Sequence, residues 1–205
     1  MAVKICGING SQAAEAAVRS GADYLGLVFA PSVRQVSLDR ARQLVRRTAA
    51  RWVGVFVDPD PAAVLEAAAE LDLAALQLHG SESPERCGEL RSAAGRPVWK
   101  ALPWTGGPDP IQRYDGAVDA VLLDTGRPLA WSEIAARFPP AARSVPLLLA
   151  GGLDPENVGQ AIALVRPDGV DASSRLESAP GVKDPVRMRA FAAAASRAAP
   201  AEDVR

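Results

Sequence analysis

Two residues that can exchange protons, Cys6 and Asp124, each stand at the end of a short apolar run of this sequence. Cys6 closes the run Val-Lys-Ile-Cys and is followed by a glycine, and Asp124 closes the run Ala-Val-Leu-Leu-Asp. A thiol and a carboxylate that face one site form a plausible base and acid pair. The chain has two cysteines in all, so a thiol at the end of the first apolar run calls for an explanation.

Other residues that could take part in catalysis or binding also follow or end apolar runs. They are Arg34, Asp58, His79, Lys100, Gly151, Gly152, Asp171, Ser173 and Ser174. If the runs are parallel strands of one sheet or barrel, their carboxyl ends meet on one face and these side chains converge. The glycine pair would also leave room for backbone N–H groups to approach a phosphate.

A structural role is open for each of these residues. A cysteine at a strand end can be a small buried filler, and Asp124, followed by Thr-Gly, can cap a turn. His79, the sole histidine, can be a hydrogen-bonded structural group. A Gly-Gly turn alone is weak support for a phosphate site.

The elements that must position these residues alternate along the whole chain. Short β-branched or leucine-rich runs predict strands at 3–6, 24–28, 53–57, 75–78, 97–100, 119–123, 146–149 and 168–171. Alanine-rich stretches predict helices near 10–20, 37–49, 61–71, 83–93, 131–138, 154–164 and 184–197. Start signals stand at Ser37, Asp60-Pro61, Ser83-Pro84 and Asp154-Pro155-Glu156. The connection 101–118 is rich in Gly and Pro and only weakly helical.

This even strand–helix rhythm predicts an α/β fold, a single (β/α)8 (TIM) barrel over residues 1–205. We expect the tail at about 198–205 to be frayed. A doubly wound open sheet is the alternative, but the first strand-to-helix turn, Cys-Gly-Ile-Asn-Gly, lacks the full G-x-G-x-x-G fingerprint.

Composition restricts the class of protein. The chain has 205 residues, 48% of them hydrophobic and 23% charged, with a net charge of −1, which suits a globular domain rather than a nucleic-acid binder. No apolar run is long enough for a membrane span, and the first residues do not form a signal peptide. Cys6 and Cys87 match no metal-ligand spacing. We therefore expect a cytoplasmic protein with reduced thiols and no metal, acting on a small-molecule substrate as a monomer, with neither nucleic acid nor membrane as partner.

Lysine is rare in this chain. Of its 23 basic residues, the three lysines are Lys4, Lys100 and Lys183. Each is either an ordinary surface residue or a residue whose position specifically requires lysine. We expect strand alternation to point Lys4 to the face opposite Cys6, so it is no obvious activator of that thiol. Lys100 could form a Schiff base.

Several segments together resemble one known family. In order and spacing, the phosphoribosylanthranilate isomerase motifs are similar to VKICGIN, GADYLGLVFAPSVRQVS, VGVFVD, LQLHG, LLDT, LLAGGLDPENV and GVDASSRLESAPGVKD. The resemblance implies a (β/α)8 barrel of tryptophan biosynthesis. It implies an Amadori rearrangement of N-(5-phosphoribosyl)anthranilate to the aminoketose, without cofactor or metal.

The resemblance also implies a role for each matching residue. Cys6 would be the general base and Asp124 the general acid, Arg34 would face the anthranilate carboxylate, and Asp171 would contact the sugar hydroxyls. Gly151, Gly152, Ser173 and Ser174 would hold the phosphate, and His79 would join the substrate site. The base must act as a thiolate, so we expect a lowered pKa for Cys6, and the acid must start protonated, which burial would favour.

Two departures from the family pattern concern the phosphate. A glycine-rich loop expected between Asp124 and Trp131 is essentially deleted, and Arg175 stands where the family usually has glycine. Arg175 could bind the phosphate in place of backbone amides. The alternatives are a paralogue acting on another aminosugar or arylamine adduct, with or without a phosphate, or a non-catalytic binding barrel.

Overall fold

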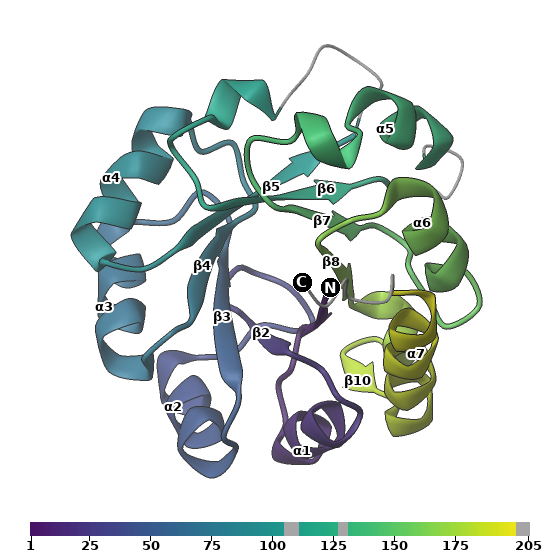
Figure 1. Ribbon diagram of the computed structural model, residues 1–205. Helices are drawn as coiled ribbons and strands as arrows, with labels where there is room; N and C mark the ends of the chain where they lie inside the picture. Colours follow the sequence, from purple (N-terminus) through teal and green to yellow (C-terminus); the bar gives the residue numbers. More distant parts are fainter. Residues whose placement is uncertain (105–110, 127–130, 200–205) are drawn as a thin grey trace, which may run out of the picture.

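A closed barrel of eight parallel strands forms the centre of the molecule (Figure 1). The computed structural model describes residues 1–104, 111–126 and 131–199. The strands are β1 (Ala2–Cys6), β2 (Tyr24–Val28), β3 (Arg51–Phe56), β4 (Ala75–Leu78), β5 (Val98–Pro103), β6 (Ala120–Asp124), β7 (Leu147–Ala150) and β8 (Gly169–Ala172). All eight predicted strands are confirmed, with ends shifted by a few residues.

Closure of the barrel is made by the first and last strands. β1 pairs in parallel with β8, with Val3 opposite Val170 and Lys4 opposite Asp171, and β1 also pairs with β2. The alternative of an open doubly wound sheet is therefore wrong. Since all strands run the same way, their carboxyl ends share one face.

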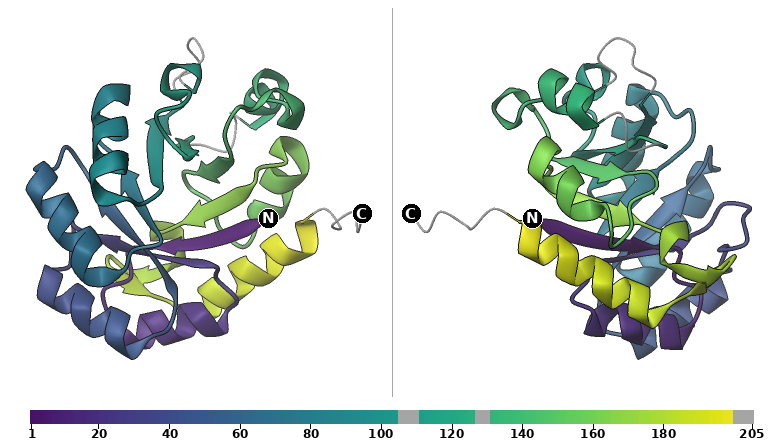
Figure 2. Two further views of the ribbon diagram at one scale, coloured as in Figure 1. Left: turned by 60° about the vertical axis from the view of Figure 1, so that its left-hand side comes forward. Right: turned by 90° about the vertical axis from the view of Figure 1, so that its right-hand side faces the viewer.

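Helices surround the barrel in the order in which the strands follow one another (Figures 1 and 2). They are α1 (Ser11–Arg19), α2 (Leu38–Arg47), α3 (Pro61–Leu71), α4 (Pro84–Ala94), α5 (Trp131–Arg137), α6 (Val158–Val165) and α7 (Pro185–Ala198). Three predicted start signals are confirmed as N-caps: Ser37, Asp60 and Ser83 each accept a hydrogen bond from a backbone N–H of the first helical turn.

The predicted start of α6 is wrong. Asp154 Oδ1 does accept hydrogen bonds from the N–H groups of Glu156 and Asn157, but these close a separate turn. The helix itself begins at Val158, after Asn157. Asp154 therefore caps a turn that precedes the helix and not the helix itself.

Alternation along the strands divides the buried residues into two sets. One set packs under the helices and contains, for example, Ile5, Leu76 and Val121. The other is a smaller cluster inside the barrel: Val53, Ala75, Trp99, Ala101, Ala120, Leu122, Leu148 and Ala150. This inner cluster fills the barrel below the face where the strands end.

Two local elements were not predicted. A two-stranded antiparallel hairpin, β9 (Glu177–Ala179) with β10 (Val182–Lys183), follows β8 and precedes α7. The described part of the weakly helical connection 101–118 contains a single 3₁₀ turn, Gln112–Tyr114. Most of the tail predicted to fray lies outside the described residues, because these end at Ala199.

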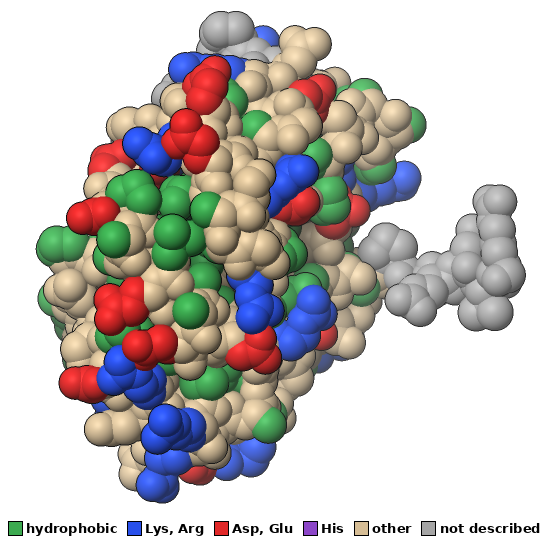
Figure 3. All heavy atoms as spheres, turned by 90° about the vertical axis from the view of Figure 1, so that its left-hand side faces the viewer, with side chains coloured by type: hydrophobic (Ala, Val, Ile, Leu, Met, Phe, Trp, Pro, Cys, Tyr) green, Lys and Arg blue, Asp and Glu red, His purple; other side chains and the backbone are tan. Residues whose placement is uncertain are grey.

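The helix-covered side of the barrel carries both signs of charge. Figure 3 shows acidic and basic side chains interspersed with small apolar areas on the face seen at the left of Figure 1. Among the described residues, no helix combines the length and the apolar character needed to cross a bilayer.

Candidate active site

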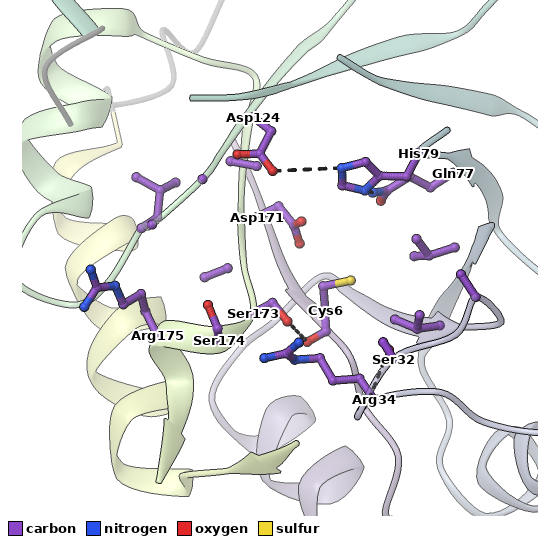
Figure 4. A pocket seen from close by; sticks show the side chains of 18 of the residues that line it. Cys6, Ser32, Arg34, Gln77, His79, Asp124, Asp171, Ser173, Ser174 and Arg175 are labelled. Carbon is purple, nitrogen blue, oxygen red and sulfur yellow. Dashed lines mark hydrogen bonds and ion pairs between the residues drawn. The ribbon is translucent and has the colours of Figure 1, made fainter. Parts of the chain in front are cut away.

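A cavity opens at the carboxyl ends of the strands and collects the residues singled out by the sequence (Figure 4). Those that line it are Cys6, Arg34, His79, Asp124, Gly151, Gly152, Asp171, Ser173, Ser174 and Arg175. Asp58, which follows β3, and Lys100, which lies within β5, do not line this cavity. The residues that line it therefore share one cavity at the strand ends, while their roles remain predictions.

The Cys6 thiol lies on the floor of the cavity. Its residue is 7% exposed, and in Figure 4 its sulfur points into the space between Asp171 and the strands opposite. The backbone carbonyl of Cys6 accepts a hydrogen bond of 3.0 Å from Ser173 Oγ, which ties the end of β1 to the loop after β8. Burial raises the pKa of Cys6, and Asp171 raises it further, against the lowering effect of Lys4. The expected lowered pKa is therefore wrong for this structure.

Lys4 is buried inside the barrel, on the same face of β1 as Cys6. Its Nζ forms an ion pair with Asp171 Oδ1 at 2.9 Å, and the lysine is fully buried. The expectation that Lys4 points away from Cys6 is wrong, because residues two apart on a strand share a face. Lys4, which the sequence analysis did not assign to the site, is the cation that lowers the pKa of the Cys6 thiol most.

Asp124 occupies the rim on the far side of the cavity. Its Oδ1 accepts a 3.1 Å hydrogen bond from the Gly126 N–H, so the carboxylate also caps the turn after β6. The side chain is 38% exposed, so the expected burial of the acid is wrong. Gly151 is required beside it: its φ is +91°, and a Cβ there would collide with Asp124 Oδ1 and Thr125 N.

His79 faces Asp124 across the cavity, as the dashed line in Figure 4 shows. Its Nε2 lies 3.9 Å from Asp124 Oδ2, and its Nδ1 lies 3.3 Å from Gln77 Nε2. In this orientation of the Gln77 amide, its nitrogen donates to Nδ1, and the ring proton of the neutral imidazole then lies on Nε2. Burial lowers the pKa of His79, although Asp124 opposes this, so the neutral form is favoured. Gln77, fully buried, was missed by the sequence analysis, although it stands two residues before His79 on one strand face.

Arg34 is held by a partner that the sequence analysis did not assign. Its Nε and Nη2 donate to the two carboxylate oxygens of Glu177 at 2.7 and 2.8 Å. Lys183 Nζ donates to Glu177 Oε1 at 2.7 Å and to the Ser173 carbonyl at 3.0 Å. The β9–β10 hairpin thus supplies Glu177 and Lys183 to the site. The side-on fork with Glu177 leaves Nη1 of Arg34 available for an anion.

The proposed phosphate end of the cavity is lined by Gly151, Gly152, Ser173, Ser174 and Arg175. Ser174 and Arg175 belong to a short 3₁₀ turn, and both are exposed. In Figure 4, Arg175 stands at the edge of the site beside Ser174. Most of the shortened loop between Asp124 and Trp131 lies outside the described residues, because 127–130 are not described.

Lys100 has a structural role. Its buried Nζ donates to the carbonyls of Leu78 and Gly80 and forms a 2.8 Å ion pair with Glu82. Glu82 in turn accepts hydrogen bonds from the N–H groups of Asp58 and Gly80. This pair fixes the loop that follows β4, from which His79 projects. Within the described residues, no cluster of His, Cys, Asp or Glu has the arrangement of a metal site.

Comparison with known proteins identifies close relatives of this chain. Residues 3–194 match the family model described as N-(5'phosphoribosyl)anthranilate (PRA) isomerase. The N-(5'-phosphoribosyl)anthranilate isomerase of Azorhizobium caulinodans is 41% identical over 213 residues, covering 96% of this chain and 92% of that protein. The enzyme of the same name from Paracoccus denitrificans is 42% identical over 216 residues, covering 96% and 97%.

Solved structures that are similar to this chain carry the same enzyme name as these sequence relatives. The crystal structure of phosphoribosyl anthranilate isomerase from Thermotoga maritima matches with a TM-score of 0.86 and 36% identity, covering 96% of this chain and 99% of that one. Another structure holds phosphoribosyl anthranilate isomerase in complex with reduced 1-(o-carboxyphenylamino)-1-deoxyribulose 5-phosphate. It matches with a TM-score of 0.85 and 37% identity, with the same coverage.

The ion pairs of Glu177 with Arg34 and Lys183 predict that the folded protein loses stability in acid. Burial alone would raise the pKa of Glu177, but hydrogen bonds from Arg34 and Lys183 outweigh it and lower that pKa to about 2. An unfolded glutamate has a pKa of about 4.3, so the stabilisation is complete above that pH and is lost as the pH falls towards 2. We expect a loss on the order of 3 kcal/mol from this residue alone, measured by urea unfolding between pH 6 and pH 2.

Two variants isolate the contribution of Glu177. Glu177→Gln should show a flatter dependence of unfolding free energy on pH, because an amide does not titrate. Arg34→Met keeps the carboxylate but removes one donor, so the pKa of Glu177 in the folded state should rise, and the loss of stability should be smaller and complete at a higher pH. Parallel curves for both variants and the natural chain would show that Glu177 is not the group responsible.

Proposed function

The chain belongs to the family of N-(5'-phosphoribosyl)anthranilate isomerases, and we propose that it performs their reaction with Cys6 as general base and Asp124 as general acid. The reaction is the Amadori rearrangement of N-(5-phosphoribosyl)anthranilate to the aminodeoxyribulose phosphate, in tryptophan biosynthesis. The observation that supports these roles best is that the thiol and the carboxylate line one cavity from opposite sides of the barrel. The related enzyme in complex with a reduced carboxyphenylamino-deoxyribulose phosphate supports the same substrate class.

Ring opening is the first proton transfer. The Asp124 carboxylic acid donates its proton to the ring oxygen of the ribose, and the bond between that oxygen and C1′ breaks. The lone pair of the anthranilate nitrogen forms a double bond to C1′, which gives an iminium ion and the Asp124 carboxylate. His79, whose Nε2–H faces Asp124, can stabilise this carboxylate as it forms.

Removal of the C2′ proton is the second transfer. The Cys6 thiolate takes this proton, and the C–H electron pair becomes the C1′–C2′ double bond while the iminium nitrogen becomes neutral. The resulting enolamine tautomerises to the aminoketose, with the proton of the C2′ hydroxyl lost and one gained at C1′. The atoms of substrate and product are the same, so no oxidant or reductant is needed.

Charged side chains would orient the substrate between these groups. Arg34 has Nη1 available for the anthranilate carboxylate, while Glu177 holds the other edge of its guanidinium. Asp171 lies beside Cys6 and can accept hydrogen bonds from the sugar hydroxyls. Gly151, Gly152, Ser173, Ser174 and Arg175 would receive the phosphate at the far edge.

We also propose a cytoplasmic location and a monomeric state for this protein. A biosynthetic role and reduced, buried cysteines support a cytoplasmic location. We propose a monomer, to be tested by light scattering. A solved Thermotoga maritima structure is of monomers generated from dimeric phosphoribosylanthranilate isomerase.

Replacing either proton-transfer group should abolish the reaction. Cys6→Ser and Asp124→Asn should each lower turnover of phosphoribosylanthranilate by about 10²–10⁴-fold or more while the fold is kept, and neither should rescue a tryptophan auxotroph lacking this isomerase. Cys87→Ala is the matched control, because Cys87 is buried on α4 outside the cavity and should leave turnover unchanged. Near-normal turnover in either site variant would remove that residue from the mechanism.

Arg34→Lys should weaken substrate binding although the charge is kept. Lysine cannot form the planar fork, so KM should rise about tenfold or more. A substrate analogue built on aniline, without the carboxylate, should be affected far less by the same change. Equal losses for both compounds would assign Arg34 a structural role.

Arg175 tests whether the substrate must be phosphorylated. A charge-assisted hydrogen bond contributes about 1.5–3 kcal/mol, so Arg175→Ala should raise KM by roughly 10–100-fold and weaken competitive inhibition by inorganic phosphate. Arg189→Ala is the control, because Arg189 is exposed on α7 and does not line the cavity. If only non-phosphorylated sugars react, or if phosphate does not compete, the phosphate assignment fails.

A further inference from the structure

A buried ammonium lies directly below the proposed base. Lys4 and Cys6 are two residues apart on β1, and both side chains enter the barrel interior. Lys4 Nζ is 2.9 Å from Asp171 Oδ1, and the strand register places Lys4 opposite Asp171. Burying a lysine paired with one carboxylate is costly, because both groups lose their hydration.

The space next to both side chains is kept open by Gly26. Gly26 is the register partner of Cys6 on β2, and a Cβ placed there would lie 2.8 Å from Cys6 Sγ and 3.2 Å from Lys4 Nζ. The sulfur and the ammonium therefore border the same small volume. A side chain at this position would push one of them aside.

The charges that face Cys6 come from several elements. Lys4 stands on β1, Asp171 on β8, Lys183 on β10 and Arg34 in the loop after β2. From β3 and β4 the cavity receives the uncharged side chains of Val55 and Gln77. Burial and Asp171 raise the pKa of the thiol, whereas Lys4 and Lys183 lower it. Lys4 and Asp171 thus shift the pKa of Cys6 in opposite directions.

We propose that Lys4 is the positioning residue that controls the charge of Cys6, and that its ammonium is shared between the Asp171 carboxylate and the Cys6 thiolate. This inference rests on the proposed role of Cys6 as base. When Cys6 ionises, its proton passes to water in the cavity, and the ammonium balances the new negative charge. Asp171 competes for the same ammonium, so a sugar hydroxyl that donates to Asp171 weakens the competition and favours the thiolate.

The proposal predicts opposite effects of two substitutions at one ion pair. With Cys87→Ala as background, Cys6 is the only thiol, and the pH dependence of its alkylation by iodoacetamide reports its pKa. Lys4→Met should raise this pKa and reduce alkylation at pH 8 about tenfold. Asp171→Asn should lower it and increase alkylation at the same pH. An unchanged profile in Lys4→Met, or a shift in the same direction in both variants, would overturn the proposal.

Two further variants separate a charge effect from damage to the fold. Lys4→Met/Asp171→Asn removes both charges together, so no unpaired ion stays buried, and its alkylation profile should fall between those of the single variants. Lys100→Met/Glu82→Gln removes another buried lysine–carboxylate pair, one that does not border Cys6, and should leave the profile of the natural chain unchanged. If the Lys100 control shifts the profile as much as Lys4→Met does, a general loss of packing explains the data and the proposal fails.

The pH dependence of kcat/KM distinguishes this inference from the proposed function. If the pKa from alkylation shifts as expected, and the pKa on the basic side of the kcat/KM profile shifts with it, both this inference and the proposed function stand. If alkylation shifts while kcat/KM does not follow, Lys4 controls the thiol but Cys6 is not the base. If Cys6→Ser abolishes turnover and alkylation does not respond to Lys4→Met, the function stands and this inference is wrong.

Discussion

The ion pair between Lys4 and Asp171 joins barrel closure to the chemistry of the site. These residues are register partners on the first and last strands, so the contact that closes the barrel also places a cation and an anion beneath Cys6. Breaking a buried pair by removing one partner typically costs about 3–5 kcal/mol, because the other charge stays buried and unpaired. A barrel closed in another register would therefore lose both stability and the electrostatic setting of its thiol.

Every lysine of the chain forms a buried ion pair with a carboxylate, as Lys4 does. Lys100 pairs with Glu82 behind the loop that carries His79, and Lys183 pairs with Glu177 behind Arg34. All three ammonium groups are buried, so the basic side chains seen on the surface in Figure 3 are arginines. A lysine ends in a compact charge that fits a small cavity among carbonyls and a carboxylate, whereas the flat guanidinium fork needs more room. The scarcity of lysine in the sequence therefore marked structural and electrostatic positions, not surface ones.

Much of the fold follows from local pattern, and much of the site does not. The strands, the caps at Ser37, Asp60 and Ser83, and the meeting of strand ends are consequences of alternation and of parallel closure. The contacts that hold the site are long-range: Lys4 and Asp171 are 167 residues apart, and Arg34 and Glu177 are 143 apart. The hairpin that delivers Glu177 and Lys183 consists of strands too short to give a clear pattern. The placement of Lys4 beside Cys6, and of Gln77 beside His79, could have been predicted locally, because a spacing of two on a strand puts both side chains on one face.

The two proposed proton-transfer groups occupy opposite environments, and this suits the order of the reaction. Cys6 lies on the floor among fixed charges, while Asp124 lies on the rim, half-exposed, with His79 and the Gly126 N–H as neighbours. In the proposed mechanism, ring opening at the rim comes first and converts the substrate into a cation. That cation makes the C2′ proton more acidic and lies above a sulfur whose own charge depends on Lys4. Because the proposed base stands on β1 and the proposed acid on β6, strands of a closed barrel rather than loops set the separation between them. A substrate that reacts with both groups must span that fixed distance.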